Sequence, residues 1–323
     1  MNKLHPLGFA AIALYVIISA GCAREVAEDS KAAELRYLEA YNQVYYQGSL
    51  VPTPSGIYYI SETNGYGTRY PADEQFVFVH YTVRSLSGTI EATDDILLSK
   101  QLGTYQDSIY FGPTLMSVAP YSQYLGWNEV MKGMNEGSHK KFIMPSWLSS
   151  YNEGGTKAYA SPMIIDIEMV EIVPDMEKWQ TDTLGHIRDK RFPALDSLAY
   201  DFYYKEIVAG TGDTSTVNDT LCISYVGYLL DGFVFDTNIA DTAVKYGIYS
   251  SSKTYSPMEV VKNEMSFVGG FTKAIELMND DCEAYTFFSF NYGYGPEKHG
   301  QIPPYSPLMF YIKLHIKRSD TEP

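Results

Sequence analysis

The chain repeats itself at a constant offset of 144 to 145 residues, and this repeat constrains the fold more than any other feature. The matched segments are Ile57-Tyr58-Tyr59 with Phe202-Tyr203-Tyr204, Gly67 with Gly212, Tyr81 with Tyr225, Gly88 with Gly232, Gly126-Trp127 with Gly270-Phe271, Met134 with Met278, and Met163 and Ile165 with Leu308 and Phe310. A register that holds over so long a stretch predicts two copies of one domain rather than a solenoid of short units. The length of 323 residues agrees, because about 150 residues is typical of one domain.

Each copy contains strand patterns and one short amphipathic helix. Apolar residues alternate along Val77 to Tyr81 and along Leu221 to Tyr225, and each copy ends in a strand, Ile164 to Ile172 and Leu308 to Ile316. Apolar residues at i, i+3, i+4 and i+7 predict the helices: Trp127, Val130, Met131 and Met134, then Phe271, Ala274, Ile275 and Met278. One helix against several strands predicts an α+β fold with the helix on one face of an antiparallel sheet.

The N-terminus has the pattern of an export signal. Lys3 precedes a run of mostly apolar residues from Leu7 to Ile18, which is too short to span a membrane. The next residues, Ser19-Ala20-Gly21-Cys22, resemble a bacterial lipoprotein processing box, which implies a signal peptide at 1–21 and lipidation of Cys22. An ordinary secretory signal is the alternative. Residues 22–49 are then a spacer, with a helix predicted by Leu35, Leu38, Tyr41 and Tyr45 and ended by Pro52 and Pro54.

Composition excludes several kinds of partner. The net charge of −15 argues against a nucleic-acid partner, because phosphate binding needs a basic face. The six histidines are scattered without metal-ligand spacing, and Asp94-Asp95 and Asp280-Asp281 are typical of turns, so neither a metal nor a cofactor is expected. An exported chain permits a disulfide between Cys222 and Cys282, but two buried free thiols are the alternative. The 29 tyrosines indicate strands and binding surfaces.

Four segments of the second copy, within residues 202–317, together resemble an FK506-binding-protein-type (FKBP-type) peptidyl-prolyl cis-trans isomerase. They are Tyr225-Val226-Gly227 followed by Leu229 to Gly232 and Phe235-Asp236-Thr237; Phe267 to Phe271 with Ala274 and Met278; Asn291-Tyr292-Gly293-Tyr294-Gly295; and Ile302 to Phe310. The resemblance implies two FKBP-like domains, each a twisted antiparallel sheet wrapped around one short helix. It also implies an apolar pocket that binds the proline ring and needs no cofactor.

Carried over from the resemblance, the catalytic pocket consists of Tyr225, Phe235, Asp236, Phe267, Val268, Phe271, Tyr294, Ile302 and Phe310. The family commonly has tryptophan at the helix entry, where this chain has Phe271, which keeps the aromatic ring and loses the indole N–H. In this reading Tyr294 donates a hydrogen bond to a substrate carbonyl, and Asp236 either orients neighbouring groups or polarises the twisting amide. The segment between Asp236 and Phe267 is longer than usual, which predicts something extra beside the pocket.

The first copy has a degenerate pocket. Tyr81 and Trp127 keep their places, but Glu91 falls at the position of Phe235 and Ala92 at that of Asp236. A carboxylate where an aromatic wall belongs predicts poor catalysis. We expect this copy to serve in dimerisation or in binding client proteins.

The sequence therefore predicts a domain order of signal peptide 1–21, spacer 22–49, degenerate FKBP-like domain 50–175, linker 176–197 and FKBP-like domain 198–323. The linker is open between a helix and a flexible joint. The expected function is prolyl isomerisation of exported, proline-containing polypeptides by a lipid-anchored protein of the bacterial outer membrane, with a homodimer through the first domain as a further expectation. The alternatives are a non-catalytic chaperone or adaptor that binds proline-containing segments, and a glycan-binding envelope lipoprotein whose tyrosines stack on sugars.

Overall fold

The structure, a computed structural model, describes residues 30–119, 125–149, 161–193 and 195–318. It divides into two compact units, residues 1–53 and 54–323. The expected signal peptide and Cys22 lie outside the described residues. Within the described part of the chain, no helix combines the length and the apolar character needed to cross a membrane.

The described part of the first unit is the helix α2 (Ser30–Tyr46) and the segment that follows it. The helix is present as predicted, but prolines do not end it. Gln47 and Gly48 both adopt left-handed backbone conformations, with φ of 55° and 71°, and this terminates the helix ahead of Pro52. The Asn42 side chain then fixes the turn, because it donates to the Leu50 carbonyl and accepts from the Leu50 N–H.

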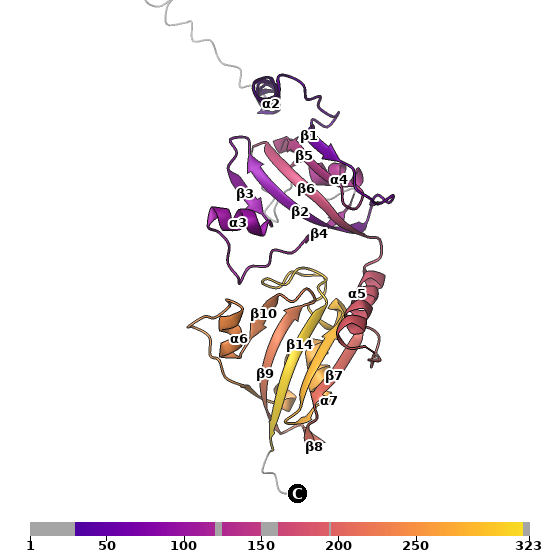
Figure 1. Cartoon of the computed structure of the whole chain (residues 1–323), viewed down its shortest axis with the longest axis vertical. Helices are drawn as coiled ribbons and strands as arrows, with labels where there is room; N and C mark the ends of the chain where they lie inside the picture. The colour runs from indigo at the N-terminus through magenta and orange to yellow at the C-terminus, as the bar shows by residue number, and fades with distance from the viewer. Residues whose placement is uncertain (1–29, 120–124, 150–160, 194, 319–323) are drawn as a thin grey trace, which may run out of the picture. The chain divides into compact units, whose positions relative to one another are not determined.

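The second unit contains two six-stranded sheets with the same strand order, and all their strand pairs are antiparallel. The first has the order β1-β5-β6-β2-β3 with β4 also on β2, and the second has β7-β13-β14-β9-β10 with β11 also on β9 (Figure 1). The first sheet comprises β1 (Tyr58–Thr63), β2 (Gln75–Ser85), β3 (Ile90–Thr93), β4 (Thr114–Val118), β5 (His139–Met144) and β6 (Met163–Val173). The second comprises β7 (Phe202–Val208), β9 (Thr220–Leu229), β10 (Val234–Thr237), β11 (Met258–Val261), β13 (Glu283–Phe288) and β14 (Leu308–Lys317). Two further short strands, β8 (Thr211–Thr214) and β12 (Asn279–Asp280), pair with each other in a separate two-stranded sheet. In the sequence, β8 follows β7 and β12 precedes β13. The predicted repeat and the α+β fold are confirmed.

One short helix packs against each sheet and closes its core. These are α4 (Leu125–Lys132) in the first domain and α7 (Gly269–Leu277) in the second. All eight apolar residues that predicted the helices are buried in the two cores, although Met134 and Met278 lie just beyond the helix ends. A glycine opens each helix close to the sheet: a Cβ on Gly270 would lie 2.3 Å from the Phe288 ring, so only glycine permits this approach.

The segment expected as an extra feature of the second domain has a counterpart in the first. Helix α6 (Ala240–Lys245) and helix α3 (Ile96–Leu102) occupy equivalent places, and each is followed by a left-handed glycine, Gly247 (φ 66°) or Gly103 (φ 71°). The loops after these helices also match, because both contain a stacked aromatic pair six residues apart. The segment is thus a common part of both domains.

The linker between the domains is largely a helix, α5 (Met176–Arg191), which begins at the N-cap Asp175. The Asp175 side chain accepts a hydrogen bond from the Lys178 N–H at 3.0 Å. Leu184 of this helix is fully buried against Tyr203, Phe287 and Met309, which lie on three strands of the second sheet. The linker therefore covers a face of the second sheet and is not a flexible joint over this range.

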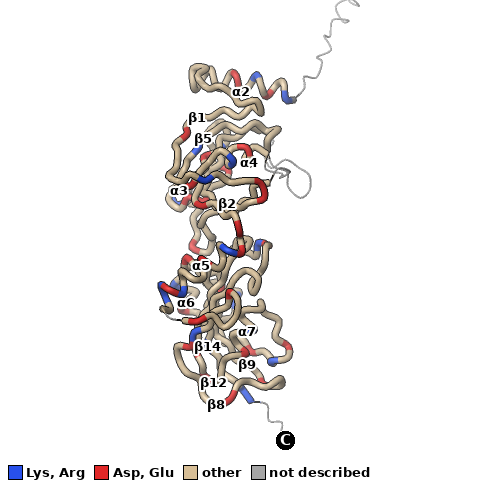
Figure 2. The backbone as a smooth tube through the Cα atoms, turned by 90° about the vertical axis from the view of Figure 1, so that its right-hand side faces the viewer, with Lys and Arg blue, Asp and Glu red and all other residues tan. Residues whose placement is uncertain are grey.

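The charged residues show no concentration of one sign in the described part of the chain. Lys and Arg are interspersed with Asp and Glu along the described backbone and are not gathered on one element (Figure 2).

Cys222 and Cys282, whose pairing the sequence left open, are both free and buried. Burial raises the pKa of the Cys282 thiol, which makes it less reactive than an exposed thiol.

Candidate active site

The candidate site contains a β-bulge at Phe235, which interrupts the regular alternation of side chains along strand β10. Strand β10 pairs with β9 through Val234 opposite Tyr228 and Asp236 opposite Gly227, which leaves Phe235 as the extra residue. Gly227 provides the room for this ring, because a Cβ at that position would lie 2.5 Å from the Phe235 ring and 3.0 Å from that of Phe310. The bulge and the glycine together place an aromatic wall over the centre of the sheet.

A cavity of about 420 Å³ opens beside this wall. Eight of the nine residues predicted for the pocket line it, and so do three residues that the sequence did not single out. The lining comprises Tyr225, Phe235, Asp236, Met258, Ser266, Phe267, Val268, Phe271, Tyr294, His299 and Phe310. The ninth predicted residue, Ile302, is 3% exposed and lies in the core beneath the cavity rather than on its surface.

The aromatic rings of the cavity hold each other edge to face. Phe271, at the start of α7, meets Phe310 with ring centroids 5.0 Å apart, Phe267 at 5.2 Å and Tyr225 at 5.9 Å. Phe310 in turn meets Phe235 at 5.6 Å and 84°. Edge-to-face packing is the favoured arrangement of aromatic pairs. It fixes the cavity as a concave, apolar surface.

The polar side of the cavity centres on Asp236. Its Oδ2 accepts a hydrogen bond from the Tyr225 hydroxyl at 2.6 Å, and its Oδ1 accepts one from the Thr237 N–H at 2.9 Å. Lys253 forms an ion pair with the same Oδ1. Burial, followed by the hydrogen bond to Asp236, raises the pKa of Tyr225, so this phenol stays protonated and donates throughout the physiological pH range.

Tyr294 lies at the mouth of the cavity on the loop after the 3-10 helix at Phe290–Tyr292. Its ring stacks on that of His299, with centroids 4.0 Å apart and planes 6° from parallel. Burial raises the pKa of Tyr294, which keeps its hydroxyl protonated. Among the described residues this hydroxyl has no hydrogen-bond partner, so it is available to donate to a bound molecule.

The first domain keeps the framework of the site without its chemistry. Tyr81 and Trp127 meet edge to face at 5.5 Å and 89°, as Tyr225 and Phe271 do. Glu91 occupies the corresponding bulge, between Val83 opposite Ala92 and Arg84 opposite Ile90, but its side chain is exposed. Val83, which is fully buried, stands where the second domain has Gly227. Within the described part of this domain, Tyr81 and Trp127 of the predicted trio are in contact, and the Glu91 side chain is exposed.

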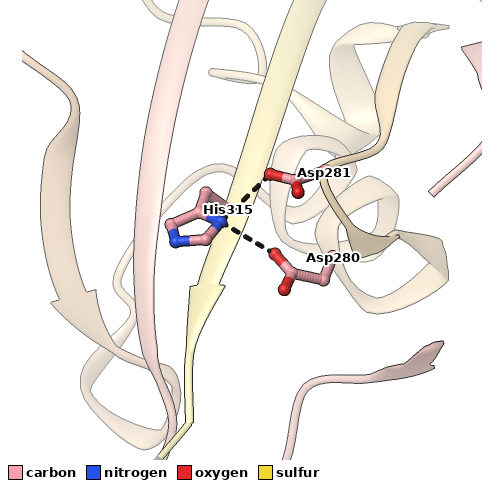
Figure 3. Close-up of side chains that lie close together, drawn as sticks. All are labelled: Asp280, Asp281 and His315. Carbon is pink, nitrogen blue, oxygen red and sulfur yellow. Dashed lines mark hydrogen bonds and ion pairs between the residues drawn. The ribbon is translucent and has the colours of Figure 1, made fainter. Parts of the chain in front are cut away.

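The structure also brings His315 close to the adjacent residues Asp280 and Asp281, which lie far from it in the sequence. His315 Nδ1 on β14 lies 3.1 Å from Asp280 Oδ1 and 3.0 Å from Asp281 Oδ1 (Figure 3). These three ligand atoms are close enough for one divalent cation. The His315 and Asp281 side chains are more than half exposed, however, and hydrogen bonding and ion pairing alone account for the arrangement, so we assign it no ligand.

The second domain thus combines an antiparallel sheet, one short helix packed on it and a cavity lined largely by aromatic residues. Residues 212–315 match the family model described as FKBP-type peptidyl-prolyl cis-trans isomerase, and the second domain of the chain belongs to this family.

Two curated proteins are similar to part of this chain. The "Macrophage infectivity potentiator" of Trypanosoma cruzi is 32% identical over 124 residues, which are 38% of this chain and 56% of that protein. The "Outer membrane protein MIP" of Legionella longbeachae is 31% identical over 127 residues, 39% of this chain and 48% of that protein. The chain therefore spans about half the length of these relatives. Among solved structures, the crystal structure of the three FKBP domains of wheat FKBP73 is similar over 82% of this chain and 97% of the wheat chain, at 17% identity and a TM-score of 0.31.

Proposed function

We propose that the chain is a peptidyl-prolyl cis-trans isomerase and that the cavity of its second domain is the catalytic site. The observation that carries the proposal is the cavity itself: eight residues assigned by the resemblance to the isomerase family line one concave surface. That surface is mostly aromatic, with the aliphatic residues Met258 and Val268 and a few polar groups, chiefly the hydrogen-bonded carboxylate of Asp236.

Such a surface suits the chemistry of proline isomerisation. Rotation about an X–Pro bond faces a barrier of about 20 kcal/mol and breaks no covalent bond, so it needs no nucleophile and no cofactor. The planar amide is polar through resonance, and the twisted transition state has lost that resonance. An apolar cavity that excludes water therefore binds the twisted form more tightly than the planar one, which is differential binding of the transition state.

Two polar groups orient the substrate in this proposal. The Tyr294 hydroxyl donates a hydrogen bond to a substrate carbonyl, because it is protonated, lies at the cavity mouth and has no partner among the described residues. Asp236 holds Tyr225 in place and polarises the twisting amide. The aromatic walls from Phe235, Phe271 and Phe310 surround the proline ring.

We propose that the protein acts in the bacterial cell envelope, anchored in the outer membrane by a lipid on Cys22, on exported polypeptides that contain proline. The signal-like N-terminus and the name of the similar Legionella longbeachae protein, an outer membrane protein, support this location. Replacing Cys22 with alanine is expected to abolish incorporation of a labelled fatty acid and to move the chain from the membrane fraction to the soluble fraction. Labelling that persists in this variant would refute the anchor.

The first domain, in this proposal, binds client proteins or a second copy of the chain and does not catalyse. Glu91, Ala92 and Val83 support this, since each removes part of the pocket that Phe235, Asp236 and Gly227 form in the second domain.

A protease-coupled assay with a proline-containing tetrapeptide tests the catalytic proposal on the full chain. We expect acceleration over the uncatalysed rate, and a loss of most of it in Phe235→Ala with an unchanged circular dichroism spectrum. Folded protein without acceleration would refute the enzyme. Binding of the peptide without acceleration would then favour the chaperone or adaptor, and retention on immobilised polysaccharide would favour the glycan-binding lipoprotein.

A further inference from the structure

The loop between α6 and β11, residues 246–257, reaches the carboxylate of the proposed site through one side chain. Lys253, seventeen positions after Asp236 in the chain, places its ammonium against Asp236 Oδ1. The other contacts of this carboxylate come from Tyr225 and Thr237, which lie on or beside the same strand pair. Lys253 is therefore the link from the loop to the polar side of the cavity.

The loop holds its own shape without that link. The rings of Tyr249 and Tyr255 stack with centroids 4.9 Å apart and planes 14° from parallel. The Tyr255 hydroxyl accepts a hydrogen bond from the Ser250 N–H at 2.9 Å, and the Lys253 N–H donates to the Ser250 carbonyl at 3.1 Å. The Lys253 ammonium also lies 5.9 Å from the centre of the Tyr255 ring, which orients it.

The first domain shows which part of this arrangement the fold requires. The offset of 144 residues relates α3 to α6 and β4 to β11 at their first residues, so the helix and the loop after it together have the same length in the two domains. The stacked pair is kept in the first domain as Tyr105 and Phe111, at 5.4 Å and 25°. At the positions of Lys253 and Asp236, however, the first domain has Ile109 and Ala92.

The loop thus folds in the same manner with or without a lysine, and the lysine and the aspartate occur together or not at all. The Lys253–Asp236 pair therefore occurs in the domain that has the pocket, and the fold of the loop does not require it.

We propose that Lys253 is a positioning residue of the isomerase site: it holds Asp236 in the orientation that accepts the Tyr225 hydroxyl, and it keeps the loop at the rim of the cavity. This inference rests on the proposed function. The Asp236 and Lys253 side chains are 43% and 36% exposed, so the ion pair is partly screened by water. We therefore expect an effect on the rate of about threefold, well short of that of a residue that touches the substrate.

The experiment is a double-mutant cycle on the full chain with the protease-coupled assay. The variants are Lys253→Met, Asp236→Asn and the double variant, because methionine keeps the apolar stem of lysine and removes the charge. We expect Lys253→Met to lower kcat/KM about threefold, chiefly through kcat, and to have no further effect in the Asp236→Asn background. Lys253→Arg should restore most of the rate. The matched control is Lys245→Met, at an exposed lysine on α6 whose ammonium lies 5.1 Å from the centre of the Tyr246 ring, and it should leave the rate unchanged.

Salt provides a second measurement. Raising the ionic strength should bring kcat/KM of the natural chain towards that of Lys253→Met and leave the variant nearly constant, because screening weakens the exposed ion pair. Equal losses from Lys253→Met in both backgrounds, or failure of Lys253→Arg to restore the rate, would overturn the proposal.

The failure of the proposed function would be distinguishable. If the natural chain gives no acceleration at all, the isomerase proposal falls. The same four proteins then still test the link through their thermal midpoints, where the effects of the two single substitutions should be less than additive when combined. Fully additive midpoints would overturn the role of Lys253 independently of catalysis.

Discussion

Replacing Gly227 with alanine is the sharpest test of how the cavity is built. Gly227 is buried on strand β9, opposite Phe310 on β14 and Asp236 on β10. Its φ is not in the left-handed region, so the backbone accepts alanine without strain. The perturbation is therefore a single methyl group placed between the two aromatic walls of the cavity, with nothing else changed.

The size of the effect follows from the contacts. The new Cβ would lie 2.5 Å from the Phe235 ring, and ordinary contact begins near 3.4 Å, so the ring must withdraw by about 0.9 Å. Phe310 blocks one direction, because the same Cβ would already lie 3.0 Å from its ring. The Phe235 ring must then move into the cavity where the proline is proposed to bind. Overpacking of this kind costs about 1 to 3 kcal/mol. Where this cost falls on the complex with substrate, kcat/KM drops by roughly fivefold to 160-fold.

The assay is proline isomerisation by the full chain, with circular dichroism and thermal unfolding to establish that the variant is folded. The double variant Gly227→Ala with Phe235→Leu is the informative companion, because the smaller side chain leaves room for the methyl group. We expect the double variant to be more stable than the sum of the single effects predicts. A Gly227→Ala protein that keeps its rate within twofold of the natural chain would refute the reasoning about the wall.

Three further outcomes are expected. Tyr225→Phe should lower kcat/KM severalfold and the free energy of unfolding by about 1 kcal/mol, because Asp236 loses a hydrogen bond at 2.6 Å; equal rates would show that this hydroxyl does not orient the carboxylate. Alkylation of unfolded, unreduced protein should label both Cys222 and Cys282, and a mass that lacks these additions would contradict the free thiols. Burial, then the charges of nearby glutamates, raises the pKa of Tyr59 from 10 to about 12. The unfolded chain therefore releases this proton first, and the free energy of unfolding should be unaffected below pH 10 and fall between pH 10 and 12, as followed by denaturant titration.

The sequence was informative where the relevant contacts are local or repeated. Alternating apolar residues predicted β9 and β14, and the spacing of Phe271, Ala274 and Ile275 predicted α7, because burial of one face imposes its period on the sequence. Because the chain repeats, the same strand and helix patterns appear in both halves of the sequence. The pocket residues came from the resemblance to a known family, since an aromatic residue in a strand looks the same whether it lines a core or a cavity. Ile302 illustrates the limit, because it lies in the core beneath the cavity.

The residues that sequence reasoning missed depend on contacts between distant segments. Lys253 meets Asp236 across a loop of irregular backbone, and His299 meets Tyr294 inside a glycine- and proline-rich loop, and neither contact follows a helical or strand period. A comparison of the two halves at the offset of 144 would have found the first, because Lys253 and Asp236 are lost together. The end of α2 was assigned to the wrong residues because the prolines were taken as the signal, whereas Gly48, a residue type that commonly follows a helix, lies ahead of them in a left-handed conformation.

The two domains separate what the fold requires from what the proposed catalysis requires. Both domains have the bulge, in β3 and in β10, the edge-to-face aromatic pair between strand and helix, and the stacked aromatic pair in the loop, so these are properties of the fold. The differences lie at the bulge and at the position facing it. Substituting phenylalanine for Glu91 alone should fail to build an aromatic wall in the first domain, because Val83 fills the space that Gly227 leaves open. A gain of peptide binding should require Val83→Gly as well, and a gain from the single substitution would show that the glycine is not what admits the ring.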